Sequence, residues 1–158
     1  MKIEEYNPIK ITAEMMRLLL SADPDEALVR SYLPTSRVLV CMSEGSDAEI
    51  TTKECIGIAL ITSSGTLYEL KNIAVSEQHQ GKGLAKQLIA ESVRLAKRLG
   101  GDRIEVGTGN SSLDQLALYQ KCGFRMFEVV PGFFESYPEP IIENGIRCID
   151  MVRLYAEL

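Results

Sequence analysis

Residues 73–85, IAVSEQHQGKGLA, contain the residue types and spacing that most clearly indicate chemistry. They combine the end of a predicted strand, a loop with two glycines and the start of a predicted helix. The unpaired amides of a helix's first turn point toward a ligand, and the helix dipole favours negative charge there. Gly81 and Gly83 let the backbone approach closely, and Lys82 and Lys86 add positive charge. This pattern is typical of a phosphate-binding loop.

Two familiar nucleotide-binding motifs do not fit this loop. A nucleoside-triphosphate loop requires GxxxxGK followed by Ser or Thr, whereas this loop reads GKG. A dinucleotide fingerprint requires GxGxxG, and Lys86 stands where the third glycine would be. That fingerprint also opens a parallel sheet near its first strand, whereas this loop follows a predicted antiparallel hairpin. Both classes of nucleotide site are therefore disfavoured.

The elements that must position this loop alternate between strands and helices. We predict strands at residues 2–6, 38–42, 55–62, 66–75, 103–106, 124–130 and 147–154, and helices at 12–20, 24–33, 83–99 and 113–121. The second helix should have Asp23 as its N-cap and Pro24 in its first position, and Pro34 should close it. Residues 63–65 read as a hairpin turn, and residues 43–52 as a polar surface loop.

The helix at residues 83–99 is expected to be long and amphipathic. Its apolar face carries Leu84, Leu88, Ile89, Ser92, Ala96 and Leu99. Gly100 and Gly101 should end it as a C-cap pair. The strand after this crossover helix should run parallel to the strand before it. Together the elements predict a mixed sheet in one domain that spans residues 1–158.

Composition excludes several classes of protein. The chain has 158 residues, of which 46% are hydrophobic and 25% charged, as expected for one globular domain. Its apolar runs, such as residues 56–61, are far shorter than the roughly 20 residues that cross a bilayer. A net charge of −5 disfavours nucleic-acid and membrane partners. The first ten residues, MKIEEYNPIK, lack the apolar stretch of a secretory signal, so we expect a cytoplasmic protein.

The cysteines do not form a metal-binding or redox motif. Cys41, Cys55, Cys122 and Cys148 are widely separated and show no CxxC spacing, so no metal site is expected. In a cytoplasmic protein they should be reduced, and free cysteines are most often buried.

The loop matches a third pattern, that of the GCN5-related N-acetyltransferases (GNAT family). Their pyrophosphate loop reads Gln or Arg, two residues, Gly, one residue, and Gly or Ala, and this chain has Gln78-x-x-Gly81-x-Gly83. A second block, LALYQKCGF at residues 116–124, lies at the family's usual separation. The sequence resembles this family along nearly its whole length. The resemblance implies a mixed, mostly antiparallel sheet of about six to seven strands flanked by about four helices.

The resemblance also implies an activity and a donor. The chain would be an acetyl-CoA-dependent N-acetyltransferase that passes an acetyl group to a primary amine by direct attack in a ternary complex. The pantetheine arm of acetyl-CoA would lie between two splayed strands, along the backbone of Ile73, Ala74 and Val75. The pyrophosphate would lie on the amides of His79, Gln80, Gly81, Lys82, Gly83, Leu84 and Ala85. The imidazole of His79 is expected to face solvent rather than to act as a catalyst.

A polar residue before the second block should contact the pantetheine. Many relatives have an asparagine about seven residues before the tyrosine of that block. Here Ser112 has this spacing, and Asn110 lies two residues earlier. Either could serve, and both are also reasonable N-caps for the helix that follows.

Acetyl transfer to an amine requires a base and an acid. An alkylamine has a pKa of about 10.4, so a base must remove its proton at neutral pH, and the departing thiolate must gain one. In relatives a tyrosine at the position of Tyr119 often supplies that proton, and a carboxylate at the position of Glu69 often acts as base through water. The alternatives are a tyrosine that packs beside Leu116 and a solvated strand glutamate. A backbone amide near residues 72–74, where relatives often carry a bulge, would stabilise the oxyanion; a bulge there leaves open which face Glu69 shares with Ile73.

The acceptor side is expected to include the long loop at residues 131–145. Phe133, Phe134 and Tyr137 could wall an acceptor pocket, and Glu135, Glu139 and Glu143 could attract a cationic amine. Alternatively, the aromatic residues cover the sheet edge or a homodimer contact. A non-catalytic acyl-CoA-binding module also stays open. An acyl intermediate on Cys122 is less favoured, because no histidine lies nearby in the sequence.

Overall fold

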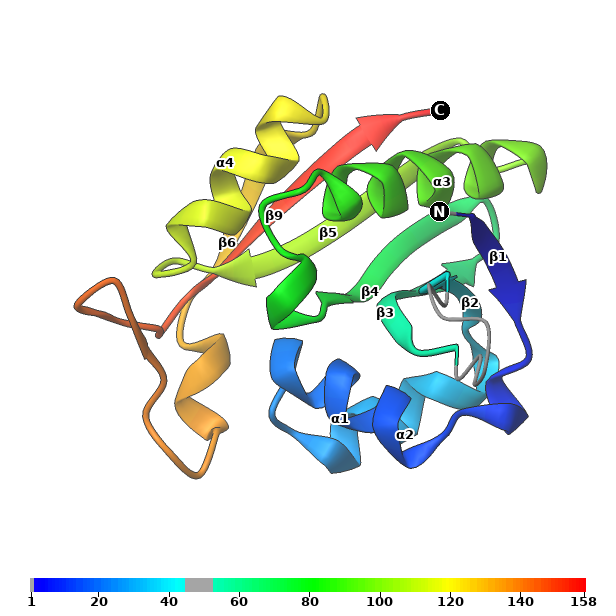
Figure 1. Cartoon of the computed structure of the whole chain (residues 1–158). Coiled ribbons are helices and arrows are strands. Elements are labelled where there is room, and N and C mark those ends of the chain that lie inside the picture. The colour runs from blue at the N-terminus through cyan, green and yellow to red at the C-terminus, as the bar shows by residue number, and fades with distance from the viewer. Residues whose placement is uncertain (1, 45–52) are drawn as a thin grey trace.

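A seven-stranded sheet runs through the computed structural model, which describes residues 2–44 and 53–158 (Figure 1). Its strands are β1 (Ile3–Tyr6), β2 (Arg37–Met42), β3 (Cys55–Ser64), β4 (Leu67–Val75), β5 (Arg103–Gly109), β6 (Arg125–Val130) and β9 (Met151–Glu157). Their order is β1-β2-β3-β4-β5-β9-β6. Only β4 and β5 pair in parallel, and the other neighbours are antiparallel. The predicted mixed, mostly antiparallel sheet is confirmed.

Helices cover both faces of the sheet (Figure 1). The α-helices of the described residues are α1 (Ala13–Ala22), α2 (Glu26–Tyr32), α3 (Leu84–Arg98) and α4 (Leu113–Lys121), and 3-10 turns span Pro8–Lys10, Leu33–Thr35, Glu77–His79 and Phe133–Ser136. One buried cluster lies between the sheet and α3, around Leu88 and Ile104, and a second lies under α1 and α2, around Leu19 and Ile58. None of the helices in the described ranges has the length and apolar character that a bilayer span requires.

The helix α3 buries the face that its period predicts, except at its end. Leu84, Leu88, Ile89, Ser92, Leu95 and Ala96 are buried. Leu99 was expected on this face but is 40% exposed, because the helix ends at Arg98 and Leu99 is already its C-cap. Gly100 follows with φ +87, a left-handed conformation that suits glycine. The predicted stop at the two glycines is confirmed.

The predicted start of α2 is wrong by two residues. Asp25, not Asp23, is its N-cap, and the Asp25 carboxylate accepts a hydrogen bond from the amide of Leu28 at 3.1 Å. Asp23 is instead the C-cap of α1, where its amide donates to the carbonyl of Leu19. The two acids stand on either side of Pro24, and only the second is close enough to bond the first turn.

The hairpin turn is also shorter than predicted. β3 continues through Ser64, which pairs with Leu67. The connection is therefore Gly65 and Thr66 alone, with Gly65 at φ +61. Two-residue turns with a positive φ match the twist of the flanking strands.

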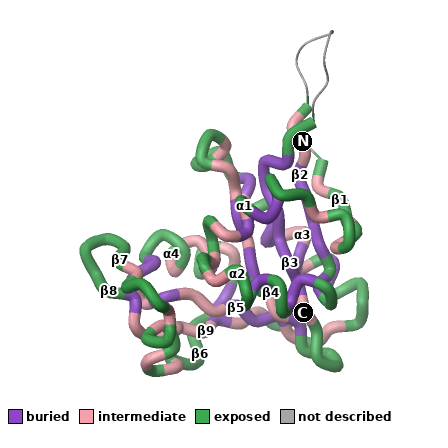
Figure 2. The backbone as a smooth tube through the Cα atoms, turned by 90° about the horizontal axis from the view of Figure 1, so that it is seen from below, coloured by how far each residue is buried: buried purple, intermediate pink, exposed green. Residues whose placement is uncertain are grey.

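The predicted last strand, residues 147–154, is divided. A small separate hairpin pairs β7 (Ile142–Glu143) with β8 (Ile146–Arg147), and β9 begins only at Met151. The side chain of Asn110 accepts hydrogen bonds from the amides at positions 149 and 150, which draws this stretch out of the sheet. Figure 2 shows buried residues concentrated in the central strands and exposed ones on the β7–β8 hairpin. Residues 45–52 of the predicted polar loop lie outside the described residues.

Candidate active site

The parallel strands β4 and β5 separate halfway along β4. Their pairing ends at Leu70 and Val106, although β4 continues to Val75 and β5 to Gly109. A cavity of about 520 Å³ lies here, lined by both strands, the α1–α2 connection, α4 and the segment around residues 133–143. Its volume is in the range of small-molecule sites.

β4 carries a β-bulge at Lys71. Leu60 of β3 pairs with Asn72, whereas the next residue, Ile61, pairs with Leu70. Lys71 is therefore the extra residue of the ladder, and the alternation of side chains along β4 shifts by one position there. The bulge lies immediately before the segment where the family resemblance placed one.

The bulge decides whether Glu69 lies on the same face of the sheet as Asn72 or as Ile73. Before it, Leu70 belongs to the buried cluster under α3; after it, Asn72 bonds to α1 and Ala74 joins the cluster under α1 and α2. Glu69, which alternates with Leu70, lies on the α1–α2 side with Asn72. Ile73 packs on the opposite side.

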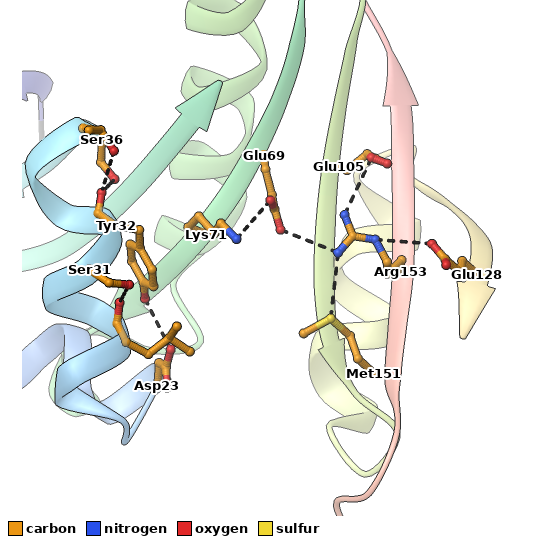
Figure 3. A network of polar contacts seen from close by, with 12 residues as sticks. Asp23, Ser31, Tyr32, Ser36, Glu69, Lys71, Glu105, Glu128, Met151 and Arg153 are labelled. Atoms are coloured by element: carbon orange, nitrogen blue, oxygen red, sulfur yellow. Dashed lines mark hydrogen bonds and ion pairs between the residues drawn. The ribbon is translucent and has the colours of Figure 1, made fainter. Parts of the chain in front are cut away.

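The Glu69 carboxylate lies between two cations at the edge of the cavity (Figure 3). Its Oε2 is 3.2 Å from Lys71 Nζ, and its Oε1 is 3.7 Å from Arg153 Nη1. The same guanidinium lies 3.7 Å from Glu105 and 3.6 Å from Glu128. Three carboxylates thus surround one arginine, and β4, β5, β6 and β9 jointly hold Glu69 in place.

Tyr119 reaches the cavity from α4. The residue is 4% exposed and lies with its ring centroid 6.0 Å from that of Phe124. Its hydroxyl has no hydrogen-bond partner within the described part of the chain. Burial, with a smaller contribution from Cys122, raises the pKa of the phenol above its ordinary value. The group therefore stays protonated near neutral pH and is able to donate a proton.

The glycine loop presents free amides at the start of α3. Gly83 is the N-cap with φ +81, and Gly81 has φ +75. The first bond to the helix runs from the amide of Gln87 to the carbonyl of Gly83 at 3.1 Å, so the amides before it lack helical acceptors. A Cβ built on either glycine would meet nothing within 4 Å among the described residues. The loop is thus open to an anionic ligand.

The free amides begin at Gly81. The His79 amide donates to the carbonyl of Ser76 at 2.9 Å, and the Gln80 amide is also bonded within the loop. His79 is half-buried, and its Nδ1 lies 2.7 Å from Ser76 Oγ. The Gln80 side chain donates to the carbonyl of Val75 at 3.0 Å. Among the described residues, the amides that are free to bind a ligand therefore begin at Gly81.

Asn110 and Ser112 have different roles, and neither side chain caps α4. Asn110 is bonded to the main chain at positions 147, 149 and 150. Ser112 occupies the N-cap position, but its hydroxyl donates to Glu143 at 3.0 Å instead of accepting from the helix. The N-cap interpretation is therefore wrong for Asn110, whereas Ser112 has the N-cap position without a capping hydrogen bond from its side chain. Of the two, Ser112 lines the cavity.

The loop after β6 supplies an aromatic wall. Phe133, Phe134, Tyr137 and Glu143 line the cavity, whereas Glu135 and Glu139 do not. The ring centroids of Phe133 and Phe134 are 5.0 Å apart, and those of Phe134 and Tyr137 are 5.5 Å apart. Among the other predicted site residues, Glu69, Ile73, Ser112 and Tyr119 line this cavity.

Sequence reasoning missed a polar group on the opposite wall. Asp23 accepts hydrogen bonds from the hydroxyls of Tyr137 at 3.1 Å and Tyr32 at 3.4 Å. Asn72, which stands between Lys71 and Ile73 in β4, donates to the Tyr32 hydroxyl at 3.1 Å. Asparagine is uncommon in strands, so Asn72 within the predicted strand at residues 66–75 was the available signal for this group.

The cysteines offer no second mechanism. All four are free, and Cys41, Cys55 and Cys148 are buried. Burial also raises the pKa of Cys122, which does not line the cavity. Within the described residues, no three His, Cys, Asp or Glu side chains gather as a metal site.

Comparisons with known proteins agree with this geometry. The model of the acetyltransferase (GNAT) family matches residues 14–124. The uncharacterised N-acetyltransferase YvbK of Bacillus subtilis is 46% identical over 146 residues, which cover 92% of this chain and 90% of that protein. The chain belongs to the GNAT family.

Two solved structures of GNAT-type acetyltransferases connect the family to its donor. A Bacillus subtilis acetyltransferase in complex with CoA has a TM-score of 0.87 and 42% identity, covering 99% of this chain and 98% of that one. A GNAT family acetyltransferase from Elizabethkingia anophelis with acetyl-CoA bound has a TM-score of 0.87 and 37% identity, covering 99% and 97%. This GNAT chain is an acetyltransferase, and it is similar to acetyltransferases whose structures contain CoA or acetyl-CoA.

Proposed function

We propose that this acetyltransferase passes the acetyl group of acetyl-CoA to a primary amine by direct attack in a ternary complex. The observation that carries the proposal is the cavity where β4 and β5 separate, because Glu69 and Tyr119 line it from different elements. Amine attack on a thioester needs a base for the ammonium proton and an acid for the thiolate. A carboxylate and a buried phenol are suited to these two tasks.

The donor would lie across the loop and the free edge of β4. Its pyrophosphate would bind the amides of residues 81–85, where both glycines leave open space and Lys82 adds charge. Its pantetheine arm would follow the backbone of residues 73–75, which has no strand partner on the β5 side. Ser112, which lines the cavity, is the better candidate for a side-chain contact than Asn110, whose amide is committed to the main chain.

The reaction then needs three proton transfers. The acceptor ammonium gives a proton through water to Glu69, and its nitrogen attacks the thioester carbonyl carbon. A backbone amide at the bulge stabilises the negative charge on the carbonyl oxygen. The carbon–sulfur bond breaks, and the CoA thiolate takes a proton from Tyr119, which burial keeps protonated. The nitrogen of the new amide loses its extra proton, which returns through water to the Tyr119 phenolate.

Ligand stabilisation tests the donor site, and turnover tests the chemistry. Acetyl-CoA at 100 times its dissociation constant should add about 2.7 kcal/mol of stability, or about 5–10 °C in Tm for a chain of this size. Gly81→Glu should abolish that shift while the variant stays folded by circular dichroism, because a carboxylate would occupy the anion site.

An amine screen with acetyl-CoA, read by mass spectrometry of the product, completes the test. Formation of an acetylated amine supports the proposal. Stabilisation by acetyl-CoA without acetylation of any amine would indicate a binding module and contradict it.

A further inference from the structure

Asp23 stands out among the charged groups of the cavity. The charged side chains that line it are Asp23, Glu69, Lys71 and Glu143. Glu69 and Lys71 form an ion pair with each other (Figure 3). Asp23 and Glu143, in contrast, have only neutral hydrogen-bond donors among the described residues. The cavity therefore has uncompensated negative charge.

The Asp23 carboxylate also has unused acceptor capacity. Oδ1 accepts from the hydroxyl of Tyr137 and from the amide of Asp25, both at 3.1 Å. Oδ2 accepts from the hydroxyl of Tyr32 at 3.4 Å. A carboxylate offers about four acceptor positions, so one on Oδ2 remains. These donors orient Asp23 without neutralising it.

A second, independent polar atom in this wall lacks a partner. Asn72 lines the cavity and is 5% exposed. Its Nδ2 donates to the carbonyl of Leu19 and to the hydroxyl of Tyr32, both at 3.1 Å. Its Oδ1 has no hydrogen-bond partner among the described residues. A buried carbonyl oxygen without a donor is costly, so this wall is short of donors as well as of positive charge.

The rings around Asp23 suit a cation. Tyr32, Phe134 and Tyr137 line the cavity. The faces of aromatic rings attract ammonium and guanidinium groups. Lys71 Nζ already lies 5.9 Å from the centroid of the Tyr32 ring. A ligand that carries both charge and N–H donors would complete the site.

We propose that Asp23 binds a second cationic group of the acceptor, with Asn72 and the tyrosine rings supporting it. The acceptor is then a diamine, or an amine with a second ammonium or guanidinium group: one amine is acetylated and the other positive charge is held at Asp23. This inference rests on the proposed amine acetylation. It gives Asp23 a role in acceptor specificity that is separate from the proposed base, Glu69, and the proposed acid, Tyr119.

The test compares two probes of the same carbon chain, 1,5-diaminopentane and 1-aminopentane. The wild-type chain should use the diamine at least about tenfold better in kcat/KM, through a lower KM. In Asp23→Asn the diamine's kcat/KM should fall about 10–100-fold toward the monoamine's value, which is what a hydrogen-bonded charge contributes. Glu135→Gln, in the same loop as Tyr137 but away from the cavity, should change neither value.

Equal use of the two probes by the wild-type chain would overturn the inference, whether or not the variant folds. A loss in Asp23→Asn that is the same for both probes would also overturn it, since it would mean that Asp23 only supports the fold. Thermal stabilisation by each probe in the presence of CoA, which needs no turnover, separates this inference from the proposed function. Diamine-specific stabilisation that disappears in Asp23→Asn supports the subsite even without acetylation, and its absence contradicts the subsite.

Discussion

Replacing Tyr119 with phenylalanine should separate stability from catalysis. The ring is buried against Phe124, so Tyr119→Phe keeps the packing that Tyr119→Ala would lose at a cost of about 3–5 kcal/mol. The hydroxyl has no partner among the described residues, so its removal leaves no buried group unsatisfied. The free energy of unfolding should change by less than about 0.5 kcal/mol, and Tm by less than about 2 °C.

Turnover should fall much further than stability. Loss of a general acid costs about 10²–10⁴-fold in kcat. A thiol of pKa about 8.5 leaves more readily than an alkoxide, which places the expected loss near 100-fold. The KM for acetyl-CoA should stay the same. The deficit should also shrink above about pH 8.5, where the CoA thiolate can leave without a proton.

The assay is product formation from a saturating amine, followed by mass spectrometry from pH 6.5 to 9.5, together with thermal unfolding. Tyr68→Phe is the matched control, because Tyr68 is 7% exposed in the same buried cluster but does not line the cavity. It should retain wild-type kcat. A Tyr119→Phe variant that keeps more than half of the wild-type kcat with unchanged acetyl-CoA affinity would refute the role of Tyr119 as acid.

Three further predictions concern the loop, the ion network and the thiols. Gly83→Ala should lower the free energy of unfolding by about 1–2 kcal/mol, because φ is +81 at this position. The same variant should bind acetyl-CoA more weakly in calorimetry, and an unchanged affinity would argue against a pyrophosphate site. Arg153→Met should lower the free energy of unfolding in urea by about 1–3 kcal/mol, because it removes a cation from buried Glu105, and Arg153→Lys should recover part of the loss. Burial raises the pKa of the Cys55 thiol to about 11. Alkylation of Cys55 by iodoacetamide at pH 8 should therefore be far slower in the native chain than in urea, and it should accelerate as pH rises. Equal rates in the native and unfolded chains would contradict the burial of Cys55.

Local signals predicted the elements around the proposed donor site. The bounds of α4 agree with the prediction, because an apolar helical period begins at Leu113 and Gly123, at φ +93, ends it. The loop before α3 was recognisable because a phosphate site requires glycines and free amides within a few residues of each other. Interactions of this kind are encoded by neighbours in the chain, so a single sequence is enough to find them.

The proposed acceptor side of the cavity depends on contacts between distant residues. Asp23 and Tyr137 are 114 positions apart and meet only because two loops close over the same cavity. From the sequence, Asp23 had the features of an N-cap, and the competing Asp25 two residues later takes that position. Glu143 was predicted from its place in the long loop at residues 131–145. Its bond to Ser112 depends on the small β7–β8 hairpin, which that prediction of a loop missed.

The bulge at Lys71 changes which face of the sheet the later side chains of β4 lie on. In a regular strand, Asn72 would share a face with Leu70 and lie in the apolar cluster under α3, where its amide would be costly to bury. One extra residue turns Asn72 toward α1, on the same face as Glu69, and leaves Ile73 packed on the other side. One strand therefore supplies both polar side chains that line the cavity and apolar side chains that pack on the opposite face of the sheet. Because no residue type marks a bulge, this arrangement could be anticipated from the family resemblance but its consequence for Glu69 could not.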